Sequence, residues 1–257
     1  MLFSVLTIFP EFLTSPLSEG IIRKARNEGK IRIEISNIRD FALDRHTTTD
    51  DRPYGGGEGM VMKPEPLAAA TRQVHADHPG KKRVILLSPQ GTVYNQSIAE
   101  RLSSTETHVV LVCGRYEGVD ERFRNRYVDE EISLGDYILT GGELGALAVI
   151  DSVSRLIPGV LGCSDSADKD TFSRNLLKHP QFTRPPTFEN QDVPSELLSG
   201  DHRRIEQYRF LASVQRTLER RPDLIGKVLF SDEELRLLQK HGLDRQIPRV
   251  GNTSGRS

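Results

Sequence analysis

Short apolar runs alternate with helix-like stretches through the first two-thirds of the chain, and this alternation is its most constraining feature. The apolar runs, rich in β-branched residues, cover residues 2–9, 31–38, 83–87, 108–113 and 137–140. Stretches with helical spacing lie at residues 18–27, 66–76, 97–102 and 143–156. Strands that alternate with helices are typical of an α/β domain with a largely parallel sheet.

Length and cysteine content narrow the class of protein. The 257 residues suit one large domain or a medium domain with a small one. Cys113 and Cys163 lie far apart without C-x-x-C spacing, which argues against a disulfide framework or a structural zinc site and fits a reducing cytoplasm. No apolar run approaches the roughly 18 residues that a membrane span needs, so we expect no membrane segment and interpret the apolar N-terminus as a buried strand.

The composition changes after Gly162. Small polar residues without periodicity are followed by HPQFTRPPTFENQDVP, whose four prolines favour extended backbone. We interpret residues 162–194 as an interdomain linker between a domain at 1–161 and a helical domain at 195–249, with a disordered tail at 250–257. The alternative is a long surface loop of a single domain.

The C-terminal domain is predicted to be helical and to meet an anionic partner. Apolar residues at helical spacing form one stripe, made of Ile205, Tyr208, Leu211, Val214 and Leu218. Arg209, Arg216 and Arg220 form a second stripe, while Ser231 opens a capping box and Gly242 closes the next helix. Residues 201–257 hold 12 Lys/Arg against 8 Asp/Glu, and the rest of the chain is acidic. This asymmetry favours an anionic partner, although ordinary solvated helix surface explains it equally well.

Glycines follow several predicted strands and indicate a ligand pocket. The chain has neither a G-x-G-x-x-G after its first strand nor a P-loop, so dinucleotide folds and P-loop NTPases are poorly supported. Glycine-containing loops occur at residues 87–91, 113–118 and 135–143. Ligands of open α/β sheets bind at the carboxyl ends of strands, where glycine permits close backbone approach. A pocket lined by main chain suits a neutral, adenosine-like ligand better than a triphosphate, because no lysine stands ready for phosphates.

A further glycine cluster at residues 50–59 lies outside any strand pattern. It is consistent with a mobile loop that presents Arg52 to a phosphate, and equally with a structural turn.

Long motifs in this chain resemble a known family. TDDRPYGGGEGM, LLSPQG, LVCGRYEGVDER, SLGDYILTGGEL, IPGVLG and HPQFTRP, in this order, are similar to segments of the bacterial tRNA (guanine-N1)-methyltransferases. The resemblance runs from residue 1 to about residue 240. It implies a SPOUT-type parallel sheet with a deep trefoil knot, followed by a small all-helical tRNA-binding domain. Periodicity alone indicates only a plain doubly wound sheet, since knots are rare.

The resemblance also implies an activity. The enzyme is expected to methylate N1 of guanosine at position 37 of tRNA, 3′ of the anticodon, with S-adenosyl-L-methionine as donor. It is expected to be a homodimer with active sites at the subunit interface, and to require Mg²⁺, whose ligands the motifs do not identify. Residues that the resemblance places against the donor are Leu87, Ser88, Pro89, Gly114, Tyr116, Glu117, Ile132, Gly135, Tyr137, Leu139, Gly141 and Gly142.

Two residues are carried over as catalytic. Asp170 corresponds to the general base and Arg155 to the arginine that faces the guanine. Sequence reasoning alone does not prefer Asp170 over Asp165 or Asp168, and Arg155 is equally explained as a cation at a helix C-terminus. The chain departs from the family at Gly145, where proline is usual, which questions the local rigidity of the donor pocket.

Two other functions stay open at this point. One is a knotted RNA methyltransferase that acts on a ribose 2′-hydroxyl, which needs no base at guanine N1. The other is a non-catalytic RNA-binding protein, which the basic C-terminal helix alone indicates.

Overall fold

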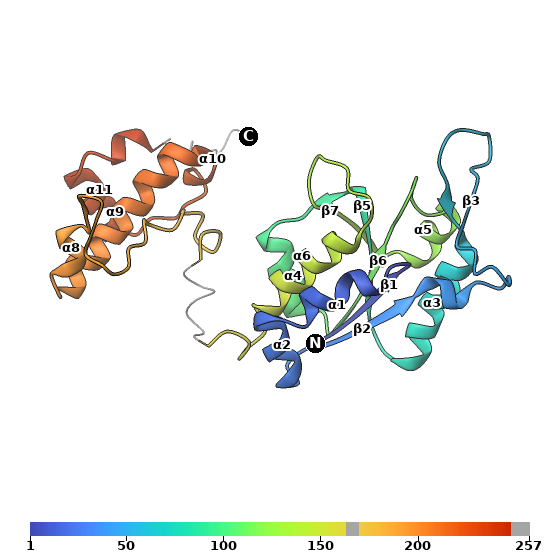
Figure 1. Cartoon of the computed structure of the whole chain (residues 1–257). Helices are drawn as coiled ribbons and strands as arrows, with labels where there is room; N and C mark the ends of the chain where they lie inside the picture. Colours follow the sequence, from blue (N-terminus) through green and yellow to red (C-terminus); the bar gives the residue numbers. More distant parts are fainter. Residues whose placement is uncertain (163–169, 248–257) are drawn as a thin grey trace. The chain divides into compact units, whose positions relative to one another are not determined.

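The computed structural model describes residues 1–162 and 170–247, and the chain divides into two compact units, residues 1–164 and 165–257 (Figure 1). Each unit has its own hydrophobic core. The predicted tail at 250–257 and the alternative bases Asp165 and Asp168 lie outside the described residues. Among the helices of the described part of the chain, none is long and apolar enough to cross a membrane.

A parallel five-stranded sheet forms the centre of the first unit and confirms the predicted α/β class. Its strands follow the order β2-β1-β6-β5-β7, and every neighbouring pair is parallel. The bounds are β1 Leu2–Thr7, β2 Arg32–Asn37, β5 Arg83–Val93, β6 His108–Cys113 and β7 Glu130–Ser133.

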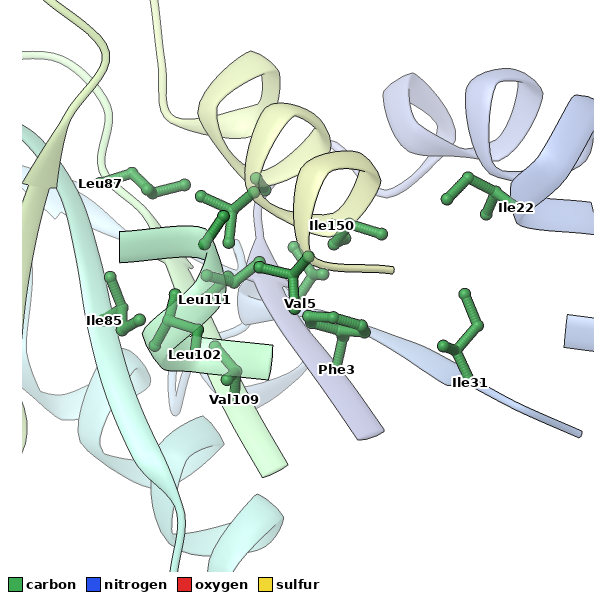
Figure 2. Close-up of a cluster of buried hydrophobic side chains, with 14 of the residues drawn as sticks. Phe3, Val5, Ile22, Ile31, Ile85, Leu87, Leu102, Val109, Leu111 and Ile150 are labelled. Atoms are coloured by element: carbon green, nitrogen blue, oxygen red, sulfur yellow. The ribbon is translucent and has the colours of Figure 1, made fainter. Parts of the chain in front are cut away.

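Helices cover both faces of this sheet. On one face lie α1 (Glu11–Leu17), α2 (Gly20–Asn27), α4 (Gln96–Thr105) and α6 (Glu143–Ser154), and on the other lie α3 (Pro64–Asp77), α5 (Glu121–Tyr127) and the 3₁₀ turn η1 (Ile38–Phe41). Side chains of a strand alternate between the faces. Val109 and Leu111 of β6 therefore pack with Ile150 of α6 (Figure 2), whereas Val110 and Val112 join the core beneath α3.

The fifth strand is not where the sequence predicted it. Residues 137–140 form a loop, and the edge strand is β7, which pairs with β5. Tyr137 and Ile138 are 56% and 82% exposed, so their apolar character does not report burial in a sheet. The stretch predicted at residues 18–27 forms α2, whereas α1 and α5 were not predicted, because Pro16 in α1 and the short length of both helices obscure their periodicity.

Strand β5 is longer than predicted and carries a bulge. Leu87 and Thr92 both pair with Ile132 of β7, so residues 88–91 leave the ladder between them. A side chain at Gly91 would overlap the backbone of Glu131 in β7, which explains the glycine there. Ser88 and Pro89 therefore do not pair with β7 and are available to line a pocket.

The glycine cluster at residues 50–59 lies mostly between two short antiparallel strands. These are β3 (Asp50–Asp51) and β4 (Val61–Met62), and Gly55, Gly56, Gly57 and Gly59 between them all have positive φ. Backbone of this kind favours glycine over residues with a Cβ.

Helices are the main elements of the second unit. Helix α9 (His202–Arg220) is accompanied by α8 (Ser195–Leu198), α10 (Pro222–Ile225), α11 (Asp232–Lys240) and the turn η2 (Asp244–Gln246). The capping box at Ser231 and the positive φ of Gly242 just after α11 are confirmed. Within the stretch interpreted as a linker, Leu176 packs into the core of this unit, and β8 (Thr187–Phe188) pairs with β9 (Gln191–Asp192).

Candidate functional site

A pocket of about 410 Å³ opens in the first unit where β6 and β7 end and β5 bulges. Eleven of the twelve residues expected against the methyl donor line it. They are Leu87, Ser88, Pro89, Gly114, Tyr116, Glu117, Ile132, Tyr137, Leu139, Gly141 and Gly142. The structure thus brings together three segments from between residues 86 and 145 of the chain, around a cavity of the size that small ligands occupy.

Gly135, the twelfth residue, lies outside this lining and shapes the loop after β7. Its φ of +146° favours glycine, its N–H donates to the Ser133 hydroxyl at 3.2 Å, and its carbonyl accepts from the Tyr137 N–H at 2.9 Å. The residue therefore sets the direction in which Tyr137 and Leu139 enter the lining.

Other lining residues were not singled out from the sequence. They are Leu86, Gln90, Arg115, Gly118, Val119, Arg124, Ser133, Leu134, Ile138, Thr140 and Gly145. Most of them are immediate neighbours of predicted residues in the same loops. Arg124 is the exception, because it comes from α5, and it donates to the Gln90 side chain at 2.5 Å.

The glycines at 141 and 142 line the pocket and also permit close contact between its loops. The Gly142 N–H donates to the Gly114 carbonyl at 3.0 Å, and Gly141 forms a β-bridge with Arg115. A Cβ at Gly142 would lie 2.8 Å from the Cys113 Cα, and one at Gly141 would overlap the Arg115 side chain. Contact between the loops is thus one reason for glycine at these positions, and the predicted close approach of a ligand stays a prediction.

A buried ion pair fastens the pocket loops to the sheet. Glu143, only 1% exposed at the first turn of α6, pairs with the Arg115 guanidinium, with 2.9 Å between Nη2 and Oε2. Thr7 at the end of β1 donates to Glu143 Oε1 at 2.6 Å, and the Arg115 guanidinium lies 4.4 Å from the Phe9 ring centroid. Charge-assisted bonds of this kind are stronger than neutral ones. The pair was not predicted, since 28 residues separate its members.

Cys113, the last residue of β6, is a buried free thiol outside the pocket lining. Burial raises the pKa of its thiol, and the neighbouring Glu143 carboxylate raises it further. A neutral buried thiol packs as a small hydrophobic group and is a poor nucleophile.

Gly145 stands at a position whose backbone would also accept the proline that is usual there. It occupies the first turn of α6, and the first backbone bond of that helix is donated by the next residue, Ala146, to Gly142 at 2.8 Å. Proline in a first turn costs no helical hydrogen bond. A Cβ at this position would lie 3.2 Å from a Leu87 methyl, so the glycine leaves slightly more room beside the pocket.

The β3–β4 region contacts the rim of the pocket. The Glu117 N–H donates to the Met60 carbonyl at 2.9 Å, and the Met62 N–H donates to the Gly118 carbonyl at the same distance. A Cβ at Gly59 would lie 2.6 Å from the Glu117 carboxylate. Arg52, the predicted phosphate contact, is exposed between these strands and outside the pocket lining.

Neither residue expected to be catalytic lines this pocket. Arg155 lies elsewhere in the first unit, and Asp170 belongs to the second unit. Arg155 is the C-cap of α6, whose N-terminus borders the pocket, so the 12-residue helix places it roughly 18 Å further along. Asp170 belongs to the second unit, where its carboxylate lies 3.5 Å from Lys178 Nζ.

The three arginines of the predicted stripe all lie on α9, a continuous helix, and therefore share one side of it. Arg209 is half-buried and pairs with Glu206 at 2.8 Å, Arg216 donates to the Lys178 carbonyl at 3.4 Å, and Arg220 is exposed.

Potential metal ligands are scattered. Within residues 1–162 and 170–247, no group of three or more His, Cys, Asp or Glu side chains is placed to hold an ion. The structure therefore names no ligand set for Mg²⁺.

Comparisons with known proteins agree with the motifs. The sequence model of the family described as tRNA (Guanine-1)-methyltransferase TrmD matches residues 1–227. A protein of Desulfatibacillum aliphaticivorans named tRNA (guanine-N(1)-)-methyltransferase is 51% identical over 258 residues, covering 99% of this chain and 96% of its own.

Proteins of the same name from Dehalococcoides mccartyi and Geotalea uraniireducens are 50% and 47% identical. The first match covers 93% of this chain and 96% of the relative, and the second covers 99% and 100%. The matches that cover 99% of this chain include both of its units. The chain belongs to the tRNA (guanine-1)-methyltransferase TrmD family.

Proposed function

We propose that this protein transfers a methyl group from S-adenosyl-L-methionine to N1 of guanosine 37 in tRNA. The observation that carries the proposal is the pocket, because eleven residues assigned to the donor by family resemblance meet around one cavity. Relatives that match nearly the whole chain bear the name of this activity.

The pocket suits a largely neutral nucleoside. Leu87, Ile132 and Leu139 offer apolar surface, and the backbone of the loops at 114–118 and 137–142 offers hydrogen-bonding groups. Both lining arginines already have side-chain partners: Arg115 binds Glu143, and Arg124 binds Gln90. An adenosine moiety therefore fits this lining better than a polyphosphate does.

The chemistry at the guanine needs a base and a cation. As the donor methyl bonds to N1, the N1 proton leaves, and negative charge accumulates on O6. A carboxylate such as Asp170 accepts that proton, and a guanidinium such as Arg155 stabilises the charge on O6. The two residues thus divide the work of proton removal and charge stabilisation.

We further propose that each active site combines residues of two subunits. Arg155 lies at the end of α6 remote from the pocket of its own chain, so a second copy is the natural source of this cation. Exposed apolar side chains near α6 support a homodimer. Phe9 lies against the lining residue Arg115, Leu144 is in the first turn of α6, and Phe12 is on α1, which packs against α6; each is between 42% and 47% exposed. Exposed apolar groups at one place on a protein are typical of an interface.

The second unit is proposed to hold the tRNA backbone. Arg209, Arg216 and Arg220 lie on one side of α9, and arginines in a row match the charge of successive phosphates. Arg52 is proposed to reach a phosphate from the first unit. A requirement for Mg²⁺, implied by the family, is proposed without an assigned ligand, and chelation with and without added Mg²⁺ tests it.

Labelled-methyl transfer to unmodified tRNA transcripts tests the function. With guanosine at position 37 we expect 1-methylguanosine in the digested product, and with adenosine there we expect no methylation. A ribose 2′-O-methyltransferase would tolerate the change of base and would require the 2′-hydroxyl. A protein that binds tRNA but neither binds the donor nor transfers its methyl group would be a non-catalytic RNA-binding protein.

A further inference from the structure

A second cavity, of about 720 Å³, lies within the second unit and has no part in the proposed methyl transfer. Residues 179–186 form one wall, and the opposite wall comes from Val193, from α8 and from the first half of α9. The lining from α8 and α9 consists of Leu197, Leu198, Ile205 and Arg209. The cavity thus occurs where the segment HPQFTRPP passes over the start of the long helix.

The backbone around this cavity is restrained. Pro180, Pro185 and Pro186 line it, and proline fixes its own φ. The Val193 N–H donates to the Pro186 carbonyl at 2.9 Å, which joins the two ends of the β8–β9 hairpin. A restrained wall loses little conformational entropy on binding, so the cavity is preorganised for a ligand.

The lining combines the rings of Phe182 and His179 with two arginines. Phe182 is 47% exposed, and Arg184 and Arg209 supply positive charge, while the lining holds no carboxylate among the described residues. Arg209 donates from Nη1 to Glu206, but its Nε is buried and has no hydrogen-bond partner in the described part of the chain. A buried donor without an acceptor costs free energy, which a bound acceptor recovers.

We propose that this cavity binds one unstacked nucleotide of the RNA substrate. A nucleotide presents a flat base for the exposed ring, a phosphate for the guanidinium groups and acceptor atoms for the Arg209 Nε. Proteins recognise single-stranded RNA in this way, by stacking splayed bases on aromatic side chains and arginine planes. The inference rests on the proposed tRNA binding by the second unit and adds a defined subsite to it.

The test compares Phe182→Ala with Phe188→Ala. Phe188 is a matched control, since it is 66% exposed, lies six residues away and does not line the cavity. For an unmodified tRNA transcript we expect Phe182→Ala to weaken binding at least fivefold, equivalent to about 1 kcal/mol, and Phe188→Ala to leave it within twofold. Phe182→Tyr keeps the ring and is expected to bind as the wild type does.

The salt dependence separates stacking from charge. Phe182→Ala should leave the slope of log affinity against log salt unchanged, whereas Arg184→Ala should flatten it by about 0.7–0.9. Circular dichroism verifies that each variant is folded.

Abasic substitutions locate the nucleotide. Among transcripts that each lack one base of a single-stranded loop, we expect one to bind the wild-type protein as weakly as the intact transcript binds Phe182→Ala. Combining that transcript with the Phe182→Ala protein should cause no further loss of affinity. If the wild type binds tRNA and the Phe182→Ala and Phe188→Ala variants bind it with equal affinity, the subsite alone is overturned. Absence of tRNA binding by the wild type would instead refute the proposed function. Loss of dimerisation in Phe182→Ala at unchanged RNA affinity would assign the cavity to a subunit contact and overturn the inference.

Discussion

Replacing Glu143 by Gln should release the loops that build the donor pocket. The carboxylate is 1% exposed and accepts from Thr7 and from Arg115 on the neighbouring loop. The substitution keeps the shape but removes the charge and turns one acceptor into a donor that faces other donors. Loss of one partner from a buried ion pair costs roughly 3–5 kcal/mol. The Arg115 side chain keeps 15% exposure and its contact with Phe9, so we expect a smaller cost of about 2–3 kcal/mol in unfolding free energy.

Urea unfolding measures this cost, and calorimetric titration with S-adenosyl-L-methionine measures the effect on the pocket. We expect donor affinity to fall at least tenfold in Glu143→Gln. The double variant with Arg115→Met should lose less stability than the two single losses combined, because the unpaired cation is gone. Glu19→Gln, which removes a carboxylate 74% exposed beside Arg23, is the control and should cost at most about 0.5 kcal/mol. A Glu143→Gln protein as stable as this control would refute the structural role of the pair.

Three further predictions concern stability and RNA binding. Gly145→Pro should raise the unfolding free energy by about 0.4–1 kcal/mol, because proline restricts the unfolded chain and fits a helical first turn, and a thermal melt that shows destabilisation would mean that the Leu87 methyl cannot move. Burial, with His78 and Lys82 nearby, lowers the pKa of His108 to about 4. As the pH falls, this histidine therefore takes up a proton in the unfolded state before it does so in the folded state. Its contribution to the unfolding free energy is complete above about pH 6.5 and is lost toward pH 4, and the loss is at most roughly 3 kcal/mol. His108→Gln should flatten this part of the pH profile, and an unchanged profile would contradict the assignment. Replacing Arg209, Arg216 and Arg220 with Ala should flatten the salt dependence of tRNA binding by about 2 with donor affinity unchanged, whereas an identical slope would place the stripe away from the RNA.

The sequence predicted the strands best where burial is continuous. The strand at residues 108–113 was predicted with its observed bounds, because all six side chains of β6 are buried. The strand predicted at residues 137–140 was wrong, because the apolar side chains of that loop line a pocket or face outward. The actual strand, Glu130–Ser133, begins with two glutamates and has no apolar run to reveal it.

Motifs located the pocket, but local pattern did not reveal what holds it together. Glycines at 141 and 142 were recognised, yet the Cys113 backbone and the Arg115 side chain that require them are near only after folding. The Arg115–Glu143 pair escaped notice for the same reason. The deep trefoil knot stays a prediction from the family, since periodicity carries no information on how a chain threads through itself.

The central claim is that donor pocket and catalytic residues of one site come from different chains. Two variants test it: Ser88→Trp, which fills the pocket, and Asp170→Asn, which keeps size and polarity but cannot accept a proton. Each homodimer should be folded and inactive in single-turnover methylation, with Asp170→Asn still binding the donor and tRNA normally.

Heterodimers of the two variants decide between shared and self-contained sites. In a twofold-symmetric dimer with shared sites, one site of each heterodimer receives an intact pocket and an intact Asp170, while the other receives both defects. We therefore expect purified heterodimers, carrying a different affinity tag on each chain, to methylate tRNA with about half the wild-type amplitude. Self-contained sites would leave one defect in each site, and verified heterodimers without activity would contradict the account.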